Sequence, residues 1–209
     1  MFKLEREMIP VIRCGLSELY NTNHIVEEFF SGNGKADLVF TSEIYFDKLT
    51  DFDFEQTYYL TTILNANRVK FKFDDLTLKH NLKGEKLRPL IDYLVSNKYM
   101  DETKGYFKMR RKFNPPVRNL ISIEAKLKNW KEGYYQALRY KYFSNKSFLA
   151  ISESYLDNVN IELLKANRIG LISVSLNGIR IIYNPPNEAP IDTTAFYFLA
   201  TTFASAFAS

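Results

Sequence analysis

The chain has 209 residues, of which 46% are hydrophobic and 15% aromatic, enough to bury one substantial core or a core with a small satellite module. A single cysteine, Cys14, excludes a disulfide framework, and two histidines, His24 and His80, are too few for a structural zinc site. The N-terminus, MFKLEREM, carries charges where an export signal needs apolar residues. We therefore expect a reduced, cytoplasmic protein.

The formal net charge of +4 is unevenly distributed along the chain. Residues 68–112 contain thirteen Lys and Arg against six Asp and Glu, a local charge of +7, which leaves −3 for the rest. A basic segment in an otherwise slightly acidic protein is typical of a polyanion-binding surface. A solvated face that serves solubility explains the charge equally well.

The first fifty residues predict one helix and one hairpin. Apolar residues recur at helical spacing over residues 4–19, where Pro10 must either begin or kink the helix. Two strands, residues 24–31 and 36–46, flank the turn Gly32-Asn33-Gly34-Lys35.

The next segment changes character to three helices and a basic β-ribbon. Helices are expected over residues 55–66, 74–82 and 85–100, the last with Pro89 tolerable only in its first turn. Residues 99–113 then predict two strands about a turn at Lys104-Gly105. This order resembles a winged helix-turn-helix, a module that binds DNA or, in other cases, protein.

Strand and helix signals alternate after Pro115-Pro116. Strands are expected over residues 119–126, 146–154 and, as a hairpin, 170–183; helices are expected from Asn129 to about Ser144 and over residues 159–168. The apolar residues 195–209 are too short and too rich in Thr and Ser for a membrane anchor, so we expect a packed helix, compatible also with a homodimer. The whole predicts an α/β protein with a mixed sheet flanked by helices, interrupted by an insertion: residues 1–50, 51–116 and 117–209.

One predicted strand carries charges that need an explanation. The two-residue period places Ser122, Glu124 and Lys126 on one face of residues 120–126 and apolar residues on the other. Burying charges without partners is costly, so either this is an edge strand with a solvated ion pair or these residues form a metal site. Glu102-Thr103-Lys104 repeats the spacing, but it lies in a turn.

Asp37 favours the metal site. It lies in the strand ADLVF, on the face opposite Leu38, and strand pairing would bring it close to Glu124. Two carboxylates and a carbonyl oxygen suit Mg²⁺, which keeps several waters in such sites. A metal so held activates water for attack on a phosphodiester.

These motifs resemble those of the PD-(D/E)xK nucleases, which have a restriction-endonuclease-like fold. LEREMI (residues 4–9), KADLVF (residues 35–40) and ISIEAK (residues 121–126) are similar in particular to archaeal Holliday-junction resolvases, and Gln136 with Tyr140 follows on the next helix. The resemblance covers roughly residues 1–46 and 117–183. Two departures are Ala36, where the family has proline, and the 87 positions between Asp37 and Glu124, which the insertion explains.

The resemblance implies a role for each matched residue. Asp37, Glu124, the Ala125 carbonyl and Glu5 (or Glu7) would hold Mg²⁺, for which Mn²⁺ would substitute. Lys126 would orient the attacking water, and Gln136 would serve the same catalytic site. A simpler interpretation is that Tyr140 is a core residue and Gln136 is solvated.

The expected function is that of a metal-dependent DNA endonuclease, with the insertion bound to DNA. Phosphate contacts are expected from eight residues: Lys83, Lys86, Arg88, Lys104, Lys108, Arg110, Arg111 and Lys112. The alternative is a catalytically inactive nuclease-fold protein that binds DNA or assists an assembly. A third possibility is a nuclease for RNA or for structured DNA.

Overall fold

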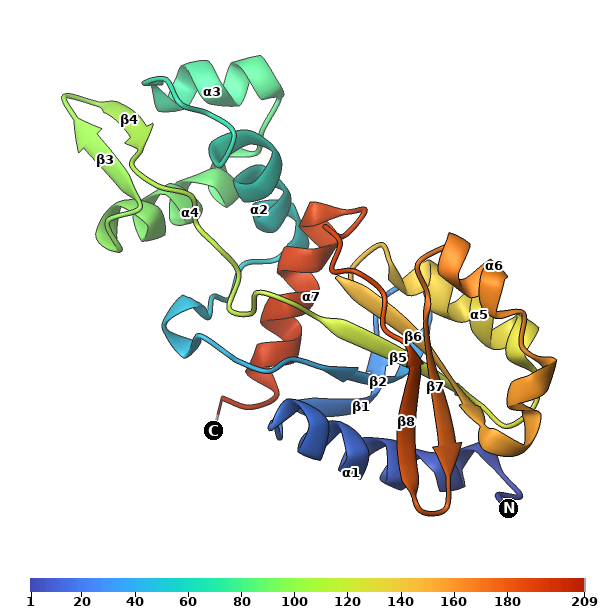
Figure 1. Cartoon of the computed structure of the whole chain (residues 1–209). Coiled ribbons are helices and arrows are strands. Elements are labelled where there is room, and N and C mark those ends of the chain that lie inside the picture. Colours follow the sequence, from blue (N-terminus) through green and yellow to red (C-terminus); the bar gives the residue numbers. More distant parts are fainter. Residues whose placement is uncertain (209) are drawn as a thin grey trace.

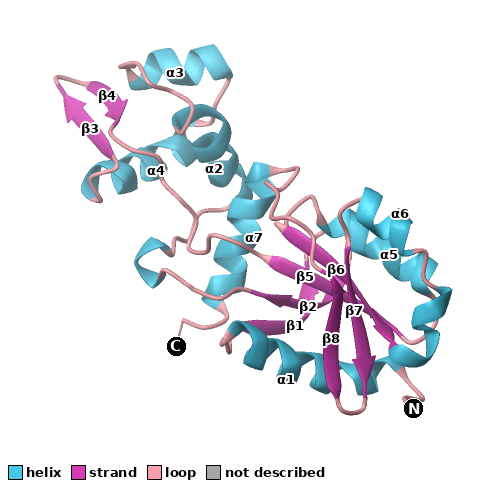
Figure 2. Cartoon of the chain, in the orientation of Figure 1, coloured by secondary structure: helices cyan, strands magenta, loops and turns pink. Residues whose placement is uncertain are grey.

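The computed structural model describes residues 1–208 and is built around one six-stranded mixed sheet (Figures 1 and 2). The strand order is β1-β2-β5-β6-β7-β8. The strands are β1 (Ile25–Phe30), β2 (Lys35–Phe40), β5 (Ile121–Lys126), β6 (Lys146–Ser152), β7 (Gly170–Ser175) and β8 (Gly178–Tyr183). The β5-β6-β7 pairs are parallel and the other three pairs are antiparallel. The predicted α/β class, with a mixed sheet flanked by helices, is confirmed.

Helices cover both faces of this sheet. One face packs on α1 (Met8–Tyr20), whose buried Met8, Ile12 and Leu16 meet the apolar side chains of the central strands. The other face packs on α5 (Trp130–Tyr140), α6 (Ile161–Ala166) and α7 (Thr193–Ser205). Both faces of β5 are therefore buried, which the alternation of charged and apolar residues had not predicted.

Pro10 is the third residue of α1, in the first turn, where its missing N–H has no helical partner to lose. The turn Glu5–Glu7 that precedes α1 is a separate 3-10 helix, so Glu5 lies before α1, although it was expected on a single helix over residues 4–19.

The insertion, residues 51–116, lies between β2 and β5 in the chain. It has a hydrophobic cluster of its own. Its elements are α2 (Phe54–Tyr58), which continues as a π-helical turn (Tyr59–Leu64), α3 (Phe73–His80), α4 (Gly84–Ser96), β3 (Met100–Thr103) and β4 (Tyr106–Met109). Lys104 and Gly105 both have positive φ, as a tight hairpin turn requires. The expected order of three helices and a ribbon is present.

Several element ends differ from the predicted ones. The strand expected to reach residue 46 ends at Phe40, and the helix expected to reach Ser144 ends at Tyr140. Pro89 lies in the second turn of α4, not in the first. It is exposed there, so its ring packs against no neighbouring element, and the helix loses only the hydrogen bond to Glu85.

The insertion is attached to the core through α7. Phe54 packs edge-on against Phe198, with ring centroids 5.6 Å apart, and the hydroxyls of Thr61 and Thr194 lie 2.8 Å apart. The Tyr197 hydroxyl donates a hydrogen bond to the carbonyl of Phe113. The C-terminal helix is thus a packed element, as expected. Within residues 1–208, no helix has the length and apolar character needed to cross a membrane.

We expect Phe203→Ala to lower the free energy of unfolding by about 3–5 kcal/mol, because Phe203 is fully buried against Phe29 and Phe207. Urea denaturation of the whole protein measures the loss. Ile191→Ala is the control, since Ile191 is 77% exposed just before α7. Equal free energies of unfolding for the two variants would show that α7 does not belong to the core.

Candidate functional site

Asp37 and Glu124 lie opposite each other on neighbouring strands. The β2–β5 register pairs Leu38 with Ile123, and one further step places Asp37 opposite Glu124. Directly opposed residues share a face of the sheet, with Cβ atoms about 4.5–5.5 Å apart. The ladder ends here because Asp37 Oδ2, in place of a backbone oxygen, accepts a hydrogen bond of 2.7 Å from the Ala125 N–H. The sequence-predicted pair is brought together.

Glu124 is a buried carboxyl with two side-chain partners. It is 2% exposed, because β5 lies between β2 and β6 and α5 covers it. Lys126 Nζ lies 2.9 Å from Oε1, and the Tyr140 hydroxyl lies 2.8 Å from Oε2. The edge-strand alternative is therefore wrong, since the ion pair lies inside the protein.

The Tyr140 hydroxyl also lies 2.7 Å from the backbone carbonyl of Lys35. It has a single proton, so it cannot donate fully to both oxygens. When Glu124 is protonated, its carboxyl can donate to Tyr140 while Tyr140 donates to Lys35. Tyr140 therefore ties the start of β2 to Glu124, a role beyond that of a core residue.

The pKa values of both carboxyls are raised. Burial is the main cause for Glu124, the charge of Asp37 adds to it, and together they raise the pKa of Glu124 to about 7 despite Lys126. Burial also raises the pKa of Asp37, against the opposing effect of the Ala125 N–H. Two carboxylates held together in this way have a chemical reason to bind a cation.

Lys126 stays positively charged in this setting. Burial lowers its pKa, but the carboxylates of Glu124, Glu5 and Asp37 outweigh burial and raise the pKa above the ordinary value. A lysine that keeps its proton donates hydrogen bonds and stabilises negative charge. It does not act as a base.

The structure distinguishes Glu5 from Glu7. Glu5 Oε1 accepts a hydrogen bond from the N–H of Leu127, and Oε2 lies 3.8 Å from Lys126 Nζ, so Glu5 borders the site. Glu7 Oε2 accepts from the backbone N–H groups of Lys3 and Leu4 instead. Of the two candidates, Glu5 is the one that approaches the carboxylates.

Gln136 lies on α5 one turn before Tyr140, and its Oε1 is buried without a hydrogen-bond partner. A buried amide oxygen without a donor is costly, and it marks a place where a donor from outside would be stabilising. The solvated alternative for Gln136 does not fit this burial.

Gly133, on the same helix, is a residue that the sequence analysis did not single out. A Cβ at this position would lie 2.7 Å from Lys126 Cγ and 2.5 Å from Leu149 Cδ1. Only glycine leaves room for the lysine stem between α5 and β5. Its signal in the sequence is a glycine inside a helical segment, which usually has a packing reason.

The donor set at this site fits a hard divalent cation. No three His, Cys, Asp or Glu side chains in residues 1–208 gather into a metal-binding group. Mg²⁺ nevertheless needs only one or two carboxylates besides waters. The N–H of Ala125 points towards β2, and the carbonyl of a strand residue points to the same side as its N–H, so this oxygen lies on the Asp37 side. Asp37, Glu124 and Ala125 together supply a fitting set.

The eight basic candidates in the insertion are not equivalent. Lys83 Nζ lies 3.0 Å from Glu55, Lys86 pairs with Asp53, and Arg110 lies 3.6 Å from Asp101. Arg88 and Arg111 lie over the rings of Phe73 and Tyr99. Three lysines have no ion-pair partner within the part of the chain that the structure describes: Lys104, Lys108 and Lys112.

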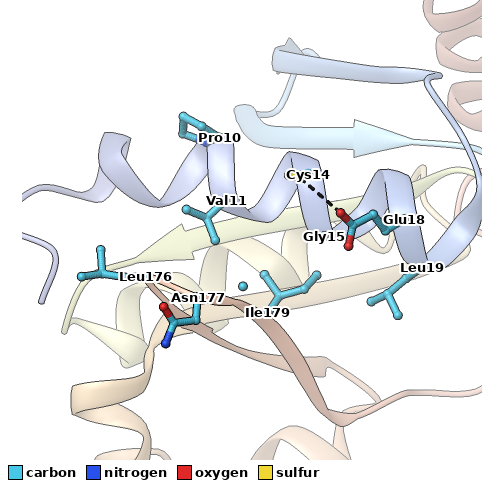
Figure 3. Close-up of a pocket in the computed structure, with 10 residues that line it drawn as sticks. Pro10, Val11, Cys14, Gly15, Glu18, Leu19, Leu176, Asn177 and Ile179 are labelled. Atoms are coloured by element: carbon cyan, nitrogen blue, oxygen red, sulfur yellow. Dashed lines mark hydrogen bonds between the residues drawn. The ribbon is translucent and has the colours of Figure 1, made fainter.

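A separate groove of about 470 Å³ lies between α1 and the β7–β8 turn (Figure 3). Its lining is mostly apolar, including Val11, Leu19 and Ile179, and its one carboxylate, Glu18, accepts a hydrogen bond from Cys14. The groove lies on the α1 side of the sheet, whereas Glu124 faces α5. It is therefore not part of the candidate site.

Comparisons with known proteins leave the family open. No family model matches the chain, and no curated protein matches it. A solved structure of a protein of unknown function from Silicibacter pomeroyi is similar over 43% of this chain and 58% of its own, with 20% identity and a TM-score of 0.33. The chain thus spans little more than half of that protein, and the likeness carries no functional argument.

The raised pKa of Glu124 predicts a pH-dependent stability. The folded state binds this proton more tightly than the unfolded state, so the free energy of unfolding should fall as the pH rises from 4.5 through about 7. The loss from this group is at most ~3 kcal/mol. Urea denaturation in EDTA at pH 5 to 8 should show it in the wild type and not in Glu124→Gln. Parallel curves for the two proteins would contradict it.

Gly133→Ala should displace Lys126 and lower the free energy of unfolding by about 1–3 kcal/mol, the usual cost of overpacking. Gly84→Ala is the matched control, because a Cβ there lies 3.7 Å from Phe73, at ordinary contact distance, and alanine favours a helix. Thermal unfolding of both variants compares them. A Gly133→Ala protein as stable as the control would show that the lysine stem has room to move.

Proposed function

We propose that the chain is a metal-dependent DNA endonuclease with a restriction-endonuclease-like core. The observation that carries the proposal is the placement of Asp37 and Glu124 on adjacent core strands, with Lys126 beside Glu124 on the same face. A protein that needed this strand only for its fold would gain nothing from three buried or half-buried charges.

The residues of the site divide the work of phosphodiester hydrolysis. Asp37, Glu124 and the Ala125 carbonyl would hold Mg²⁺, and Glu5 would assist from the edge of the site. When bound, Mg²⁺ lowers the pKa of a coordinated water and neutralises charge on the phosphate. Lys126, which keeps its proton, donates hydrogen bonds to the attacking oxygen or to a phosphate oxygen. Tyr140 fixes the Glu124 carboxyl, and Gln136 presents its free oxygen to a donor.

The insertion would supply the contact with DNA as a winged-helix module. Three features support this: the order of three helices and a hairpin, the isolated β-bridge between Phe71 and Phe107 beside that hairpin, and the local charge of +7. Lysines and arginines at the ribbon contact phosphates, which orients the duplex without reading its sequence.

A second candidate is a protein of the same fold that binds DNA and does not cut it. The contacts of Glu124 favour this second candidate, because Lys126 and Tyr140 already bind the two oxygens of that carboxyl. The two candidates differ in cleavage and agree in binding, so one assay separates them.

The test is a plasmid-nicking assay with Mg²⁺ or Mn²⁺. We expect metal-dependent nicking, and Glu124→Gln and Lys126→Met should each reduce its rate by about 100-fold or more. Glu162→Gln and Lys165→Met are the matched controls, because these residues form an exposed ion pair on α6.

Nicking without metal, or nicking that survives both site variants, would refute the assignment. Binding of duplex DNA without any cleavage would establish the second candidate. Hairpin, four-way-junction and RNA substrates in the same assay identify a preference for structured or ribonucleic substrates.

A further inference from the structure

The two-stranded sheet of the insertion, β3-β4, is extended by an isolated bridge at Phe71 and has two different faces. Phe71 forms an antiparallel bridge to Phe107, with N–H to carbonyl hydrogen bonds of 3.0 and 2.8 Å, and β4 pairs with β3. Phe71 and Phe107 are buried in the hydrophobic cluster of the insertion. Because side chains alternate along a strand, the residues beside these two phenylalanines point the other way.

That outward face is basic. Continuing the antiparallel register from Phe71 and Phe107 places Lys70 opposite Lys108 and Lys72 opposite Tyr106. All four residues are exposed, and Lys72 Nζ lies 5.2 Å from the centre of the Tyr106 ring. Like charges directly opposite each other destabilise a sheet, so the juxtaposition of Lys70 and Lys108 does not stabilise the fold.

Few carboxylates offset this charge. Asp101 is the partner of Lys108 in the β3–β4 register, and its ion pair is with Arg110, 3.6 Å away. None of Lys70, Lys72 and Lys108 forms an ion pair within residues 1–208. The face therefore presents three ammonium groups that form no ion pair and one exposed aromatic ring.

Helix α4, the usual reading element of a winged helix, is a poorer anion site. Lys86 and the preceding Lys83 are paired with carboxylates of the α2 segment. The other charged side chains exposed on α4 are Glu85, Arg88 and Asp92, which carry a net negative charge. A phosphate backbone would meet repulsion there and attraction on the outer sheet.

We propose that the outer sheet face, Lys70, Lys72, Tyr106 and Lys108, binds the phosphate backbone of duplex DNA. The proposal deepens the proposed function by naming the docking surface, and it rests on the choice of DNA made there. Lysine ammonium groups contact phosphates as point charges and do not read base edges, so binding through this face tolerates any sequence. Each phosphate that a lysine neutralises adds about 0.9 to the salt dependence of log K.

The test is fluorescence anisotropy of a labelled 20-base-pair duplex with the full-length protein in EDTA, over a series of salt concentrations. Lys70→Gln/Lys72→Gln/Lys108→Gln should bind at least ten-fold more weakly, with a salt slope reduced by about 2 to 3. The comparison protein, with the same change of charge, is Lys83→Gln/Lys86→Gln/Arg88→Gln. It should keep the salt slope of the wild type.

An α4 variant that loses as much affinity and slope as the sheet variant would overturn the proposal. So would a sheet variant that binds like the wild type, or a duplex RNA that binds more tightly than DNA through the same lysines. The single variants Lys70→Gln and Lys108→Gln should each lower the slope by about 1, which keeps the test open if the triple variant is unstable.

This assay separates the two proposals. It contains no metal and measures no cleavage, so a protein that fails to nick DNA can still lose affinity through Lys70, Lys72 and Lys108. Glu162→Gln should bind the duplex as the wild type does, because Glu162 lies on α6 in the core and not in the insertion.

Discussion

The carboxyl of Glu124 is the constraint around which the candidate site is organised. A carboxylate that is 2% exposed in a central strand costs several kcal/mol unless partners replace its water. Two partners do so, Lys126 from the same strand and the Tyr140 hydroxyl from α5, whereas the charge of the opposed Asp37 adds to the cost. Gly133 leaves the space that lets Lys126 reach Glu124. The fold thus keeps two acids together that repel each other.

The insertion leaves this arrangement intact because of where it enters. The chain leaves the sheet at the end of β2, Phe40, and returns at the start of β5, Ile121, and these two residues are paired in the antiparallel ladder. The long segment between them therefore begins and ends at neighbouring points of the sheet. Its own cluster of buried residues stabilises it, and α7 fixes it to the core through Thr194 and Phe198.

Much of this could be predicted from periodicity and turn residues. The strand-helix order, the hairpin turns and the convergence of Asp37 with Glu124 follow from alternation and from pairing. The burial of the charged face of β5 does not, because an alternating strand indicates a half-exposed sheet, and only the packing of α5 shows that both faces are covered. Lys70 and Lys72 were missed for a similar reason: their neighbour Phe71 forms a single bridge, too short for a strand pattern.

The positions of the site and of the basic sheet constrain how one duplex could use both. Lys126 ends β5, whereas the insertion joins the opposite end of that strand (Figure 1). Glu124 lies three residues beyond Ile121, which is about 10 Å along the strand at 3.3 Å per residue. A further seven residues, 114–120, separate Ile121 from Phe113, which belongs to the hydrophobic cluster of the insertion. A duplex held by Lys70 and Lys108 would therefore have to run along the core before it reached the carboxylates. Under the two proposals, the bond that is cut lies outside the stretch of DNA that the insertion holds, so the sequence-tolerant contact and the cleavage chemistry act on different base pairs.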